Sequence, residues 1–406
     1  MTDERTRQFI ATHRREDVRT LALHTTRHSD VDIPYALAQI AGWQTACQKL
    51  PSWAAIDDIV YPPHLSMEQC SSEHTARYKA ALCRRLLSDS SHTTSLTDLT
   101  GGLGVDFSFM AQEFGHATYV EQQDTLCEMA RHNLPLLGLG HATVIHADGV
   151  DTLANLSDVD LLFLDPARRD RHGARTFAIA DCTPNILLIE AQLLAKARWV
   201  MLKLSPMLDW HKAMDDVQRD HPHTVREIHI VAVGNECKEL LFVLSAKEAG
   251  SPTIHCVNDR QAFVTSVGEA LTPPHLEGLR SIDDCQDMRY LYEPHAAMMK
   301  AGCFGALTSR WPVHPLAHNS HLFLSSDRID DFPGRSFEII HICTMNKKQL
   351  RSLTEETPQA NITVRNFPLT AAELRRKLKI KDGGSHYLFA STTEDNTHVI
   401  FVCRKQ

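Results

Sequence analysis

Apolar residues recur at helical spacing through the first 90 residues of the chain. Val31–Leu50 shows this period, and Met67–Leu87 shows it again after a break at Pro62-Pro63. A period near 3.6 residues places the apolar side chains on one face of a helix, and adjacent prolines interrupt helices. This stretch has no alternating strand pattern, so we expect a helical region over residues 1–90.

Short apolar runs then alternate with helical segments up to about residue 245. The runs are Ser95–Leu99, Ala117–Val120, Thr143–His146, Leu161–Leu164, Trp199–Leu204, Glu227–Val233 and Leu240–Leu244. Strands separated by helices are typical of a mostly parallel sheet with helices on both faces. We therefore predict an α/β domain over residues 91–250.

The pattern becomes less regular after residue 250. Thr272-Pro273-Pro274 and Trp311-Pro312 interrupt it, which favours a small α+β segment over residues 251–330. Strand and helix patterns then alternate before a terminal hairpin, over Ser336–His341, Lys347–Glu355, Ile362–Asn366, Ala371–Leu378 and a turn across Ser391–Asn396. We expect a second small α+β domain over residues 331–406.

The composition is that of a globular protein with several domains. The 406 residues are 43% hydrophobic and 23% charged, and no apolar run approaches the roughly 18 residues that a membrane span needs. The N-terminus is charged from its third residue, and the eleven cysteines include no C-x-x-C pair. We therefore expect a cytoplasmic protein with reduced thiols and no membrane contact.

Charge is unevenly distributed along the chain. Residues 331–406 carry 12 Lys/Arg against 8 Asp/Glu, whereas the whole chain has a net charge of −8. The basic cluster Arg375-Arg376-Lys377-Leu378-Lys379 lies in this part. A basic module on an acidic protein is compatible with nucleic-acid binding, and a solvated helix face is the alternative interpretation.

The apolar run Ser95–Leu99 leads into a glycine-rich turn. Asp98 ends the run, and Thr100-Gly101-Gly102-Leu103-Gly104 follows. Glycines let a ligand approach the backbone closely, but a dinucleotide site needs a small residue where Phe107 stands, and Asp98 would repel a pyrophosphate. The Asp98 carboxylate instead suits the ammonium and sulfonium groups of S-adenosylmethionine. We expect Asp98, Thr100, Gly101, Gly102 and Gly104 to bind this cofactor.

Acidic residues also end the next two predicted strands. Glu121 follows Ala117–Val120, where a doubly wound fold presents an acid to two ribose hydroxyls. Asp148 follows Thr143–His146, from where it can accept a hydrogen bond from the adenine amino group. Each acid taken singly can instead cap a helix or meet solvent. Three acids in register favour a cofactor site.

The fourth predicted strand ends in a rigid polar turn, Asp165-Pro166-Ala167-Arg168-Arg169. We expect Asp165 to contribute to the cofactor site and also to accept a hydrogen bond from a target amine, while Pro166 holds the acceptor in line with the methyl group. Arg168 and Arg169 are expected to contact substrate phosphates, and Arg168 to take part in catalysis. The alternative interpretation makes Asp165 a helix cap and both arginines partners in surface ion pairs.

Residues 90–245 resemble the class I S-adenosylmethionine-dependent methyltransferases, which have a Rossmann-like sheet. The resemblance rests on Asp98, Gly102, Gly104, Glu121, Asp148 and Asp165-Pro166 in this order. The form D-x-x-x-G-x-G at Asp98–Gly104 and the sequence Ala130-Arg131-His132-Asn133 resemble motifs common in RNA methyltransferases. The resemblance implies the cofactor strongly and the substrate only by analogy.

Further motifs resemble a bacterial family of THUMP-like-domain methyltransferases. These motifs are Glu68-Gln-Cys-Ser-Ser-Glu73, Tyr78-Lys79, Asp165-Pro-Ala-Arg-Arg169, Lys203-Leu-Ser-Pro206, Asn235-Glu-Cys-Lys-Glu-Leu240, Tyr292-Glu-Pro294, Asn366-Phe-Pro368 and Lys381-Asp-Gly-Gly384. In this family, a ferredoxin-like segment and a THUMP-like domain follow the catalytic domain. Because THUMP domains are associated with RNA-modifying enzymes, the resemblance implies tRNA or rRNA as substrate.

The chain departs from the RNA 5-methyluridine methyltransferases, whose D-P-P-R motif Asp165-Pro-Ala-Arg168 resembles. Those enzymes have a nucleophilic cysteine after the next strand, where this chain has Leu204-Ser205-Pro206. Methylation of the pyrimidine 5-position needs a covalent thiolate adduct, which Leu204 cannot supply. We therefore hypothesise methylation of a nitrogen or another heteroatom.

A dense polar cluster lies between the last two apolar runs. We expect Asn235 and Glu236 to line the substrate pocket, with a tight turn between two strands as the alternative. Cys237 is a less favoured candidate nucleophile beside Lys238. Further upstream, Ser71 or Ser72 either contacts the cofactor's methionine end or caps a helix.

The 24 histidines raise the question of a metal site. His314, His318 and His321 are spaced for one helical face, but Trp311-Pro312 and Pro315 interrupt that helix. No acid or cysteine pattern accompanies them, so we expect no metal.

Two other functions stay open beside RNA methylation. One is a methyltransferase that acts on a protein or a small molecule. The other is a non-catalytic RNA adaptor that binds S-adenosylmethionine without transferring its methyl group.

Overall fold

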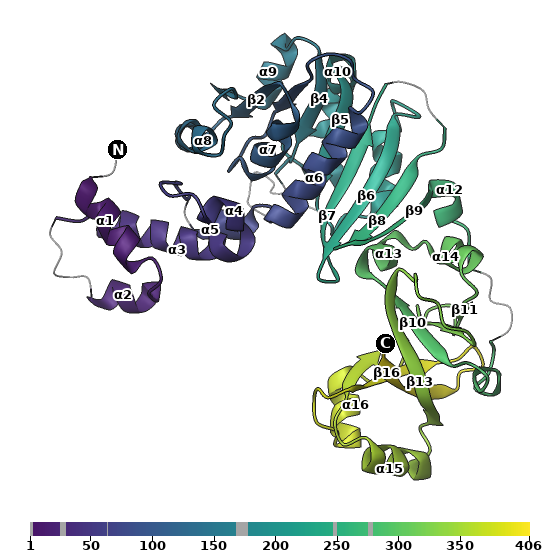
Figure 1. Cartoon of the computed structure of the whole chain (residues 1–406). Coiled ribbons are helices and arrows are strands. Elements are labelled where there is room, and N and C mark those ends of the chain that lie inside the picture. The colour runs from purple at the N-terminus through teal and green to yellow at the C-terminus, as the bar shows by residue number, and fades with distance from the viewer. Residues whose placement is uncertain (1–2, 25–29, 63, 168–177, 247–249, 275–278) are drawn as a thin grey trace. The chain divides into compact units, whose positions relative to one another are not determined.

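The computed structural model describes residues 3–24, 30–62, 64–167, 178–246, 250–274 and 279–406. The chain folds into two compact units. The first unit comprises Met1–Arg226 and Glu239–Ala249, and the second comprises Glu227–Lys238 and Gly250–Gln406. The chain passes from the first unit to the second within β6 (Val225–Val233) and returns within β7 (Glu236–Leu244) (Figure 1).

The N-terminal part of the first unit is helical, as the sequence predicts. Its helices are α1 (Glu4–His13), α2 (Val18–His24), α3 (Ile33–Lys49), α4 (Pro51–Ala54), α5 (His64–Gln69) and α6 (Glu73–Leu86). The apolar stretch Met67–Leu87 is divided between α5 and α6. Ser72 causes this break, because its side chain accepts a hydrogen bond from the Thr75 amide and so begins a new helix.

These helices pack against the α/β part of the same unit. Trp53, Met67 and Ala80 share an apolar cluster with Phe109 of α7 (Val105–Met110). Asn133, from the predicted A-R-x-N motif, donates to the Val60 carbonyl oxygen at 2.8 Å and accepts from the Val60 amide at 2.9 Å. The motif therefore ties the sheet region to the N-terminal helices.

The sheet of the first unit follows the predicted strands closely. It contains β1 (Ser95–Asp98), β2 (His116–Glu121), β3 (Thr143–His146), β4 (Val159–Leu164), β5 (Ala197–Leu204) and β7, in the order β3-β2-β1-β4-β5-β7. The first five are parallel, and β7 is antiparallel to β5. The predicted α/β fold is confirmed.

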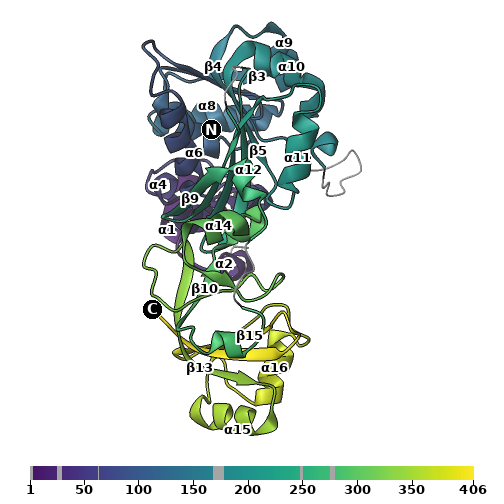
Figure 2. The same cartoon turned by 90° about the vertical axis from the view of Figure 1, so that its right-hand side faces the viewer.

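Helices cover both faces of this sheet. They are α7, α8 (Asp124–Leu136), α9 (Gly149–Asn155), α10 (Ile186–Lys196) and α11 (Trp210–Val217). Figure 2 shows α9, α10 and α11 on one side of the strands and α6 and α8 on the other. The chain leaves β1 towards β2 on one side, and β4 lies on the other side, so the strand order reverses between β1 and β4. Ligands of open α/β sheets bind at the carboxyl ends of strands at such a reversal.

The second unit begins with part of β6, which pairs in parallel with β8 (Thr253–Asn258), and β8 pairs with β9 (Gln261–Ser266). Short helices α12 (Val267–Ala270), α13 (Ala296–Ala301) and α14 (Phe304–Arg310) follow. A second sheet then has the order β11-β12-β10-β13-β16-β15-β14. Its strands are β10 (Tyr290–Pro294), β11 (His314–Pro315), β12 (Phe323–Ser325), β13 (Gly334–Thr344), β14 (Asn361–Val364), β15 (His386–Thr392) and β16 (His398–Lys405), with helices α15 (Lys347–Glu356) and α16 (Ala371–Leu378).

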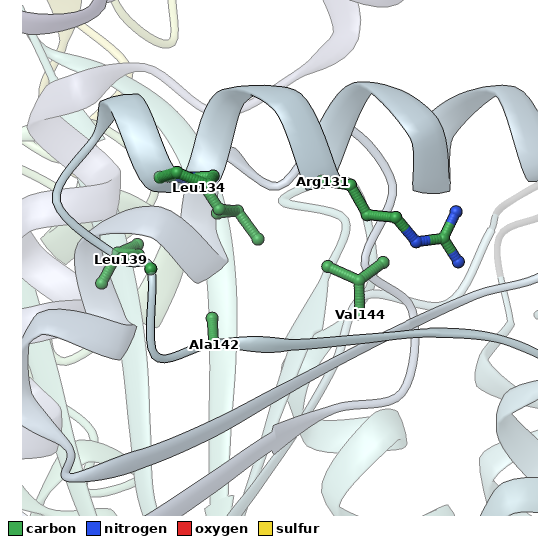
Figure 3. A pocket seen from close by; sticks show the side chains of 7 residues that line it. Arg131, Leu134, Leu139, Ala142 and Val144 are labelled. Atoms are coloured by element: carbon green, nitrogen blue, oxygen red, sulfur yellow. The ribbon is translucent and has the colours of Figure 1, made fainter.

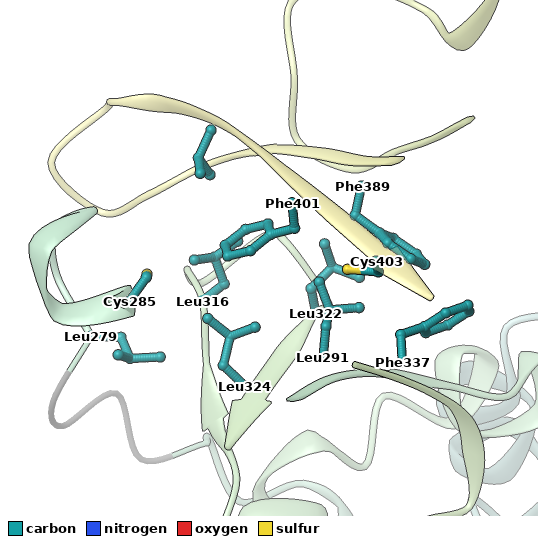
Figure 4. Packing of buried hydrophobic residues seen from close by; sticks show 11 residues of the cluster. Leu279, Cys285, Leu291, Leu316, Leu322, Leu324, Phe337, Phe389, Phe401 and Cys403 are labelled. Carbon is teal, nitrogen blue, oxygen red and sulfur yellow. The ribbon is translucent and has the colours of Figure 1, made fainter. Parts of the chain in front are cut away.

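One apolar core joins the two C-terminal segments of the second unit. Leu291 and Leu324, from β10 and β12, pack with Phe337, Phe389 and Phe401 of β13, β15 and β16 (Figure 4). All five side chains are buried. The strands on either side of residue 330 therefore form one sheet over one core. In the described part of the chain, no helix is long and apolar enough to span a bilayer.

This shared core predicts one cooperative transition for the two segments. Replacing Leu291 in β10 or Phe401 in β16 by alanine should lower the free energy of unfolding by about 2–5 kcal/mol, because each substitution leaves a cavity in the same core. Both variants should shift the same transition in chemical denaturation followed by circular dichroism. Ile340→Ala, at a half-exposed position of β13, serves as the control and should change little. Two variants that shifted two different transitions would contradict a shared core.

Candidate active site

The predicted cofactor residues gather at the carboxyl edge of the first unit's sheet. Asp98 is the last residue of β1, and Glu121 is the last of β2. Asp148 lies between β3 and α9, and Asp165 follows β4. Because these strands are parallel neighbours in the order β3-β2-β1-β4, their carboxyl ends place all four acids along one edge.

The glycine-rich turn after β1 is shaped by a tyrosine of the next strand. A side chain at Gly101 would overlap the ring of Tyr119, with a Cβ only 2.3 Å from its nearest atom. The Tyr119 hydroxyl donates to the Gly102 carbonyl oxygen. Gly104 has a φ of +73° and begins α7, a conformation that side chains disfavour. The turn therefore needs glycine for packing at position 101 and for backbone conformation at position 104.

Glu121 braces this turn from the end of β2. One of its carboxylate oxygens accepts from the Gly102 amide at 2.9 Å, and the other accepts from the Gln123 amide at 2.9 Å. The side chain is buried, with 7% of its surface exposed. A carboxylate has about four acceptor positions, so these two bonds leave capacity for hydroxyl donors.

Asp98 is buried directly beneath the turn. Its Oδ1 accepts from the Thr100 amide at 2.9 Å, and Thr100 Oγ1 accepts from the Asp165 amide at 2.7 Å. Burial raises the pKa of Asp98 to about 8, against a smaller lowering by the Thr100 bond and with a further increase from Asp106 and Asp165. A cation that binds beside Asp98 would stabilise the charged form of this buried carboxyl group.

Asp148 is engaged as the N-cap of α9. Its Oδ1 accepts from the amides of Val150 and Asp151 at 2.7 and 3.3 Å. Gly149 lies close to the end of β1, where the glycine-rich turn begins, since a Cβ at position 149 would approach the Leu99 carbonyl oxygen to 2.2 Å. The helix-cap alternative therefore describes the contacts of Asp148, and its part in cofactor binding stays a prediction.

The donor set suits S-adenosylmethionine better than a nucleotide phosphate. The turn from Asp98 to Asp106 contains no lysine or arginine, and its two ends are carboxylates. Buried acids attract the ammonium and sulfonium groups of the cofactor, and Glu121 suits ribose hydroxyls. The residues present therefore fit this cofactor.

Asp165 stands at the end of β4 with a defined cationic partner. Its Oδ2 accepts from Lys203 Nζ at 2.6 Å, and 42% of its side-chain surface is exposed. The next residue, Pro166, is buried, and Ala167 exchanges two backbone hydrogen bonds with Thr183, at 2.7 and 3.0 Å. Hydrogen bonds therefore hold the residues on either side of Pro166, Asp165 and Ala167. Arg168 and Arg169, also predicted here, lie outside the described residues.

Lys203 links Asp165 to a buried polar cluster. Its Nζ lies 3.1 Å from Asp106 Oδ2 and 2.9 Å from Ser71 Oγ, and Ser71 Oγ itself lies 2.8 Å from Asp106 Oδ2. Burial alone would lower the pKa of Lys203, but Asp106, Asp165 and Glu239 raise it well above its usual value. Lys203 is therefore a permanent cation at the end of β5.

A second buried lysine completes this cluster. Lys79 of α6 is fully buried, lies 3.0 Å from Asp106 Oδ1 and contacts Glu239 Oε2. Burial alone would raise the pKa of Asp106, but Lys203, Lys79 and Ser71 lower it to about 2. The charges of Lys79 and Lys203 therefore compensate the buried acids, and the N-terminal helices supply part of the site.

Sequence reasoning missed Lys79, Lys203, Asp106 and Glu239 as site residues. Three of them stand in the family motifs Tyr78-Lys79, Lys203-Leu-Ser-Pro206 and Asn235–Leu240. The presence of a charged residue in each of these motifs was the signal in the sequence that could have identified the cluster. Ser71 makes contacts in this cluster, whereas its neighbour Ser72 is the helix cap.

The predicted substrate residues Asn235 and Glu236 lie in the second unit. Asn235 has a φ of +64° in the turn between β6 and β7, where its side chain accepts from the Ala296 amide at 2.8 Å. Glu236 pairs with Lys238 at 2.6 Å. The tight-turn alternative therefore accounts for the contacts of Asn235, and substrate contact stays a prediction for both residues.

A hollow of about 270 Å³ lies elsewhere on the first unit. Arg131, Leu134, Leu139, Ala142 and Val144 line it, between the end of α8 and the start of β3 (Figure 3). It lies at the amino end of β3, whereas the acids described above lie at the carboxyl ends of the strands. The hollow is therefore separate from the candidate site.

Two family models match the second unit. A model described as a ferredoxin-like domain matches residues 290–333, and one described as THUMP domain-like matches residues 334–405. A search of curated protein sequences gives no significant match. The strands of both matched segments belong to the sheet over the shared core.

Solved structures are similar to the whole chain or to part of it. A crystal structure described as a "putative methyltransferase" from Porphyromonas gingivalis W83 has 32% sequence identity, covers 100% of both chains and has a TM-score of 0.83. A SAM-dependent methyltransferase from Agrobacterium tumefaciens has 18% identity over 46% of this chain and 65% of its own, with a TM-score of 0.34. The O-methyltransferase from Bacillus cereus in complex with SAH has 12% identity, coverages of 50% and 90% and a TM-score of 0.35.

The buried cluster predicts a large difference between two substitutions in α6. Lys79→Met should destabilise the first unit by about 3–5 kcal/mol, because it removes the buried ion-pair partner of Glu239 and leaves Asp106 with Lys203 alone. The matched control is Arg84→Met, which removes an exposed ion pair with Glu113 from the same helix and should hardly change stability. Urea denaturation of both variants measures the difference. Equal stabilities would contradict a structural role for the cluster.

The raised pKa of Asp98 predicts that cofactor affinity depends on pH. Below about pH 8 the free carboxyl group is protonated, so binding a cation there must release a proton. Affinity for S-adenosylmethionine should therefore increase by up to about tenfold per pH unit between roughly pH 6 and pH 7.5. Calorimetric titration at several pH values measures this increase.

Asp98→Asn is the matched variant, because asparagine resembles the protonated acid in shape. It should keep the fold, bind the cofactor weakly and show little pH dependence. Wild-type affinity that did not change with pH would count against contact between Asp98 and the cofactor.

Proposed function

The chain belongs to the family of S-adenosylmethionine-dependent methyltransferases that carry ferredoxin-like and THUMP-like domains, and on this premise we propose that it methylates a heteroatom of structured RNA, in tRNA or rRNA. The observation that carries the proposal is the half-exposed Asp165 carboxylate, held by Lys203 at the carboxyl edge of β4. Asp165 lies beside the glycine-rich turn after β1. The neighbouring strand β5 ends at Leu204, which has no thiol.

The cofactor, when bound, supplies an electrophilic methyl group on a sulfonium sulfur. Gly102 and Gly104 give the cofactor access to the backbone, Glu121 accepts from ribose hydroxyls, and Asp98 faces the cationic groups. Asp148 accepts from the adenine amino group in addition to capping α9. The remaining catalytic task is to place the acceptor atom in line with the methyl group.

Asp165 and Pro166 perform this placement. Lys203 occupies Asp165 Oδ2, and the carboxylate retains acceptor capacity for an N–H of the target. S-adenosylmethionine, when bound, would supply the methyl group to the acceptor lone pair and would keep the electron pair of the broken sulfur–carbon bond. The methylated nitrogen then releases its proton to Asp165 or to water. Arg168 and Arg169 are proposed to contact the RNA phosphates near this point, and Arg168 to assist the transfer.

We propose a heteroatom as the methyl acceptor because the cysteines considered as nucleophiles are poorly suited to forming a covalent adduct. Leu204 occupies the end of β5, and Ser205 follows it. Burial raises the pKa of Cys70, the cysteine next to Ser71, and it raises the pKa of Cys237 in the second unit. A thiol whose pKa is raised is a poor nucleophile at neutral pH. Direct transfer to nitrogen or oxygen needs no covalent adduct.

RNA is the proposed partner because the THUMP-like segment carries exposed cations. Arg376, Lys377 and Lys379 are exposed at the C-terminal half of α16 and just after it. Arg375 differs from them, since it pairs with Asp382 and donates to the Ala360 carbonyl oxygen. We propose that the three exposed residues contact RNA phosphates while Arg375 fixes the helix.

We also propose a cytoplasmic location, which suits the eleven free cysteines. The alternatives are methylation of a protein or small molecule, and binding of the cofactor without catalysis. Label from S-adenosylmethionine in protein alone would favour the first alternative. Binding without transfer to any substrate would favour the second.

The catalytic role of Asp165 predicts that binding and transfer can be separated. Asp165→Ala should bind S-adenosylmethionine with nearly unchanged affinity but transfer methyl groups to RNA at least about 100-fold more slowly, because the acceptor loses its orienting contact. Transfer of tritium from labelled cofactor into RNA from a strain lacking the gene measures the rate.

Asp158→Ala is the matched control for this experiment, since Asp158 is exposed just before the amino end of the same strand. It should behave as the wild type. Normal transfer by Asp165→Ala would remove Asp165 from the mechanism.

The proposed RNA contact predicts a change in salt dependence. Reversing the charges of Arg376, Lys377 and Lys379 to glutamate should weaken RNA binding and make the slope of log affinity against log salt shallower by about 0.7–0.9 for each phosphate that the protein no longer neutralises. Filter binding at several salt concentrations measures this slope. Substitutions are preferable to deleting residues 331–406, which would remove four strands of the second sheet and much of the shared core.

A control variant with the same change in net charge carries glutamate at Arg15, Arg19 and Lys212, which are exposed in the first unit. Its salt slope should stay closer to that of the wild type. Equal slopes for both triple variants would show that α16 makes no special contribution.

A further inference from the structure

Two histidines and a glutamate converge on neighbouring strands of the second unit. Glu227 and His229 lie two residues apart in β6, and His255 lies in β8. The parallel register pairs Glu227 with Thr253 and His229 with His255. Residues i and i+2 of a strand share a face, and paired residues of adjacent strands are neighbours on it, so the three side chains lie on one face.

The donor atoms of these side chains lie at distances that suit a common metal ion. Glu227 Oε2 lies 2.9 Å from His229 Nε2 and 4.0 Å from His255 Nε2. All three donor atoms lie within 4.8 Å of one another. Ligands at about 2.0–2.2 Å from a tetrahedral zinc ion are roughly 3.3–3.6 Å apart. The observed distances bracket this value, so rotations of the side chains are enough to close the site.

The two imidazole rings are held in related orientations. They stack with centroids 4.3 Å apart and an angle of 24° between their planes, and each directs its Nε2 towards the Glu227 carboxylate. Thr253 Oγ1 adds an oxygen 3.0 Å from His255 Nε2. Ring nitrogens of two histidines beside one carboxylate form a donor set that binds divalent transition metals.

The three side chains differ in how far they are exposed to solvent. The His229 side chain is 1% exposed, whereas those of Glu227 and His255 are 15% and 17% exposed. Glu227 and His255 therefore keep some contact with solvent, from which an ion would arrive, whereas His229 does not. Desolvation around His229 strengthens the attraction between the carboxylate and a cation.

The sequence led us to expect no metal, and these three residues are dispersed along the chain; from their convergence we propose that Glu227, His229 and His255 bind a zinc ion that joins β6 to β8. Imidazole and carboxylate ligands suit Zn²⁺, and three protein ligands leave the fourth tetrahedral position for a water molecule. Because two of the ligands come from β6 and the third from β8, an ion bound here would hold this strand pair in register within the second unit.

The test measures zinc on the full-length protein after removal of metal by a chelator. The wild type should rebind one Zn²⁺ per chain in equilibrium dialysis followed by elemental analysis. Glu227→Gln, which preserves size, and His255→Asn should each weaken zinc binding at least about 10-fold in competition with a chromophoric chelator. Removing a ligand should cost no less affinity than removing a residue that hydrogen-bonds to a ligand. The controls are Glu338→Gln and His341→Asn, at exposed positions of β13, which should bind as the wild type does.

The eleven free cysteines require a second readout, because thiolates also bind zinc. Co²⁺ in place of Zn²⁺ should give the visible absorption of a nitrogen and oxygen site, without a sulfur charge-transfer band. Circular dichroism checks the fold, and Glu227→Gln decides the outcome if His255→Asn does not fold. The proposal is overturned if the wild type does not rebind stoichiometric zinc or if Glu227→Gln binds zinc with unchanged affinity. A sulfur charge-transfer band in the Co²⁺ spectrum would also overturn it.

Discussion

The first unit depends on a network of ion pairs that joins α6 and α7 to β5, β7 and the residue after β4. Lys79 and Lys203 lie among the carboxylates of Asp106, Glu239 and Asp165, with Ser71 between them. Buried charges cost several kcal/mol each unless they are paired, so each member fixes the positions of the others. The cluster therefore joins the N-terminal helices to the sheet and sets the orientation of Asp165.

The two acids that flank the turn after β1, Asp98 and Asp106, have pKa values shifted in opposite directions. Asp106, in α7, meets two ammonium groups, and its pKa falls to about 2. Asp98, before the turn, has no such partner in its described contacts, and its pKa rises to about 8. One acid is already compensated within the protein, and the other is best compensated by a cationic ligand. This difference explains how a strongly acidic edge can select a cofactor that carries positive charge.

Local sequence patterns predicted the elements of the fold but not the contacts between distant segments. The strands β1, β3 and β4 and the helix α16 begin and end within about two residues of the predicted runs, because each is set by its own apolar periodicity. The pairing of Lys79 with Glu239 spans 160 positions and follows only from packing. The apolar period of Met67–Leu87 does not register the break before α6, which Ser72 makes through the capping bond that the sequence offered as one of two interpretations. Asp98, Glu121 and Asp165 were identifiable because strand ends of a parallel sheet meet at one edge.

Chemical analysis of cellular RNA tests the central claim most directly. Nucleosides from digested tRNA and rRNA of a strain lacking this gene would be compared by mass spectrometry with those of the same strain carrying the wild-type gene or the Asp165→Ala variant. The account predicts that one methylated nucleoside, with its methyl group on nitrogen or oxygen, is absent from the deletion strain and is restored only by the wild-type gene. An unchanged set of nucleosides, or loss of a 5-methylpyrimidine, would contradict it.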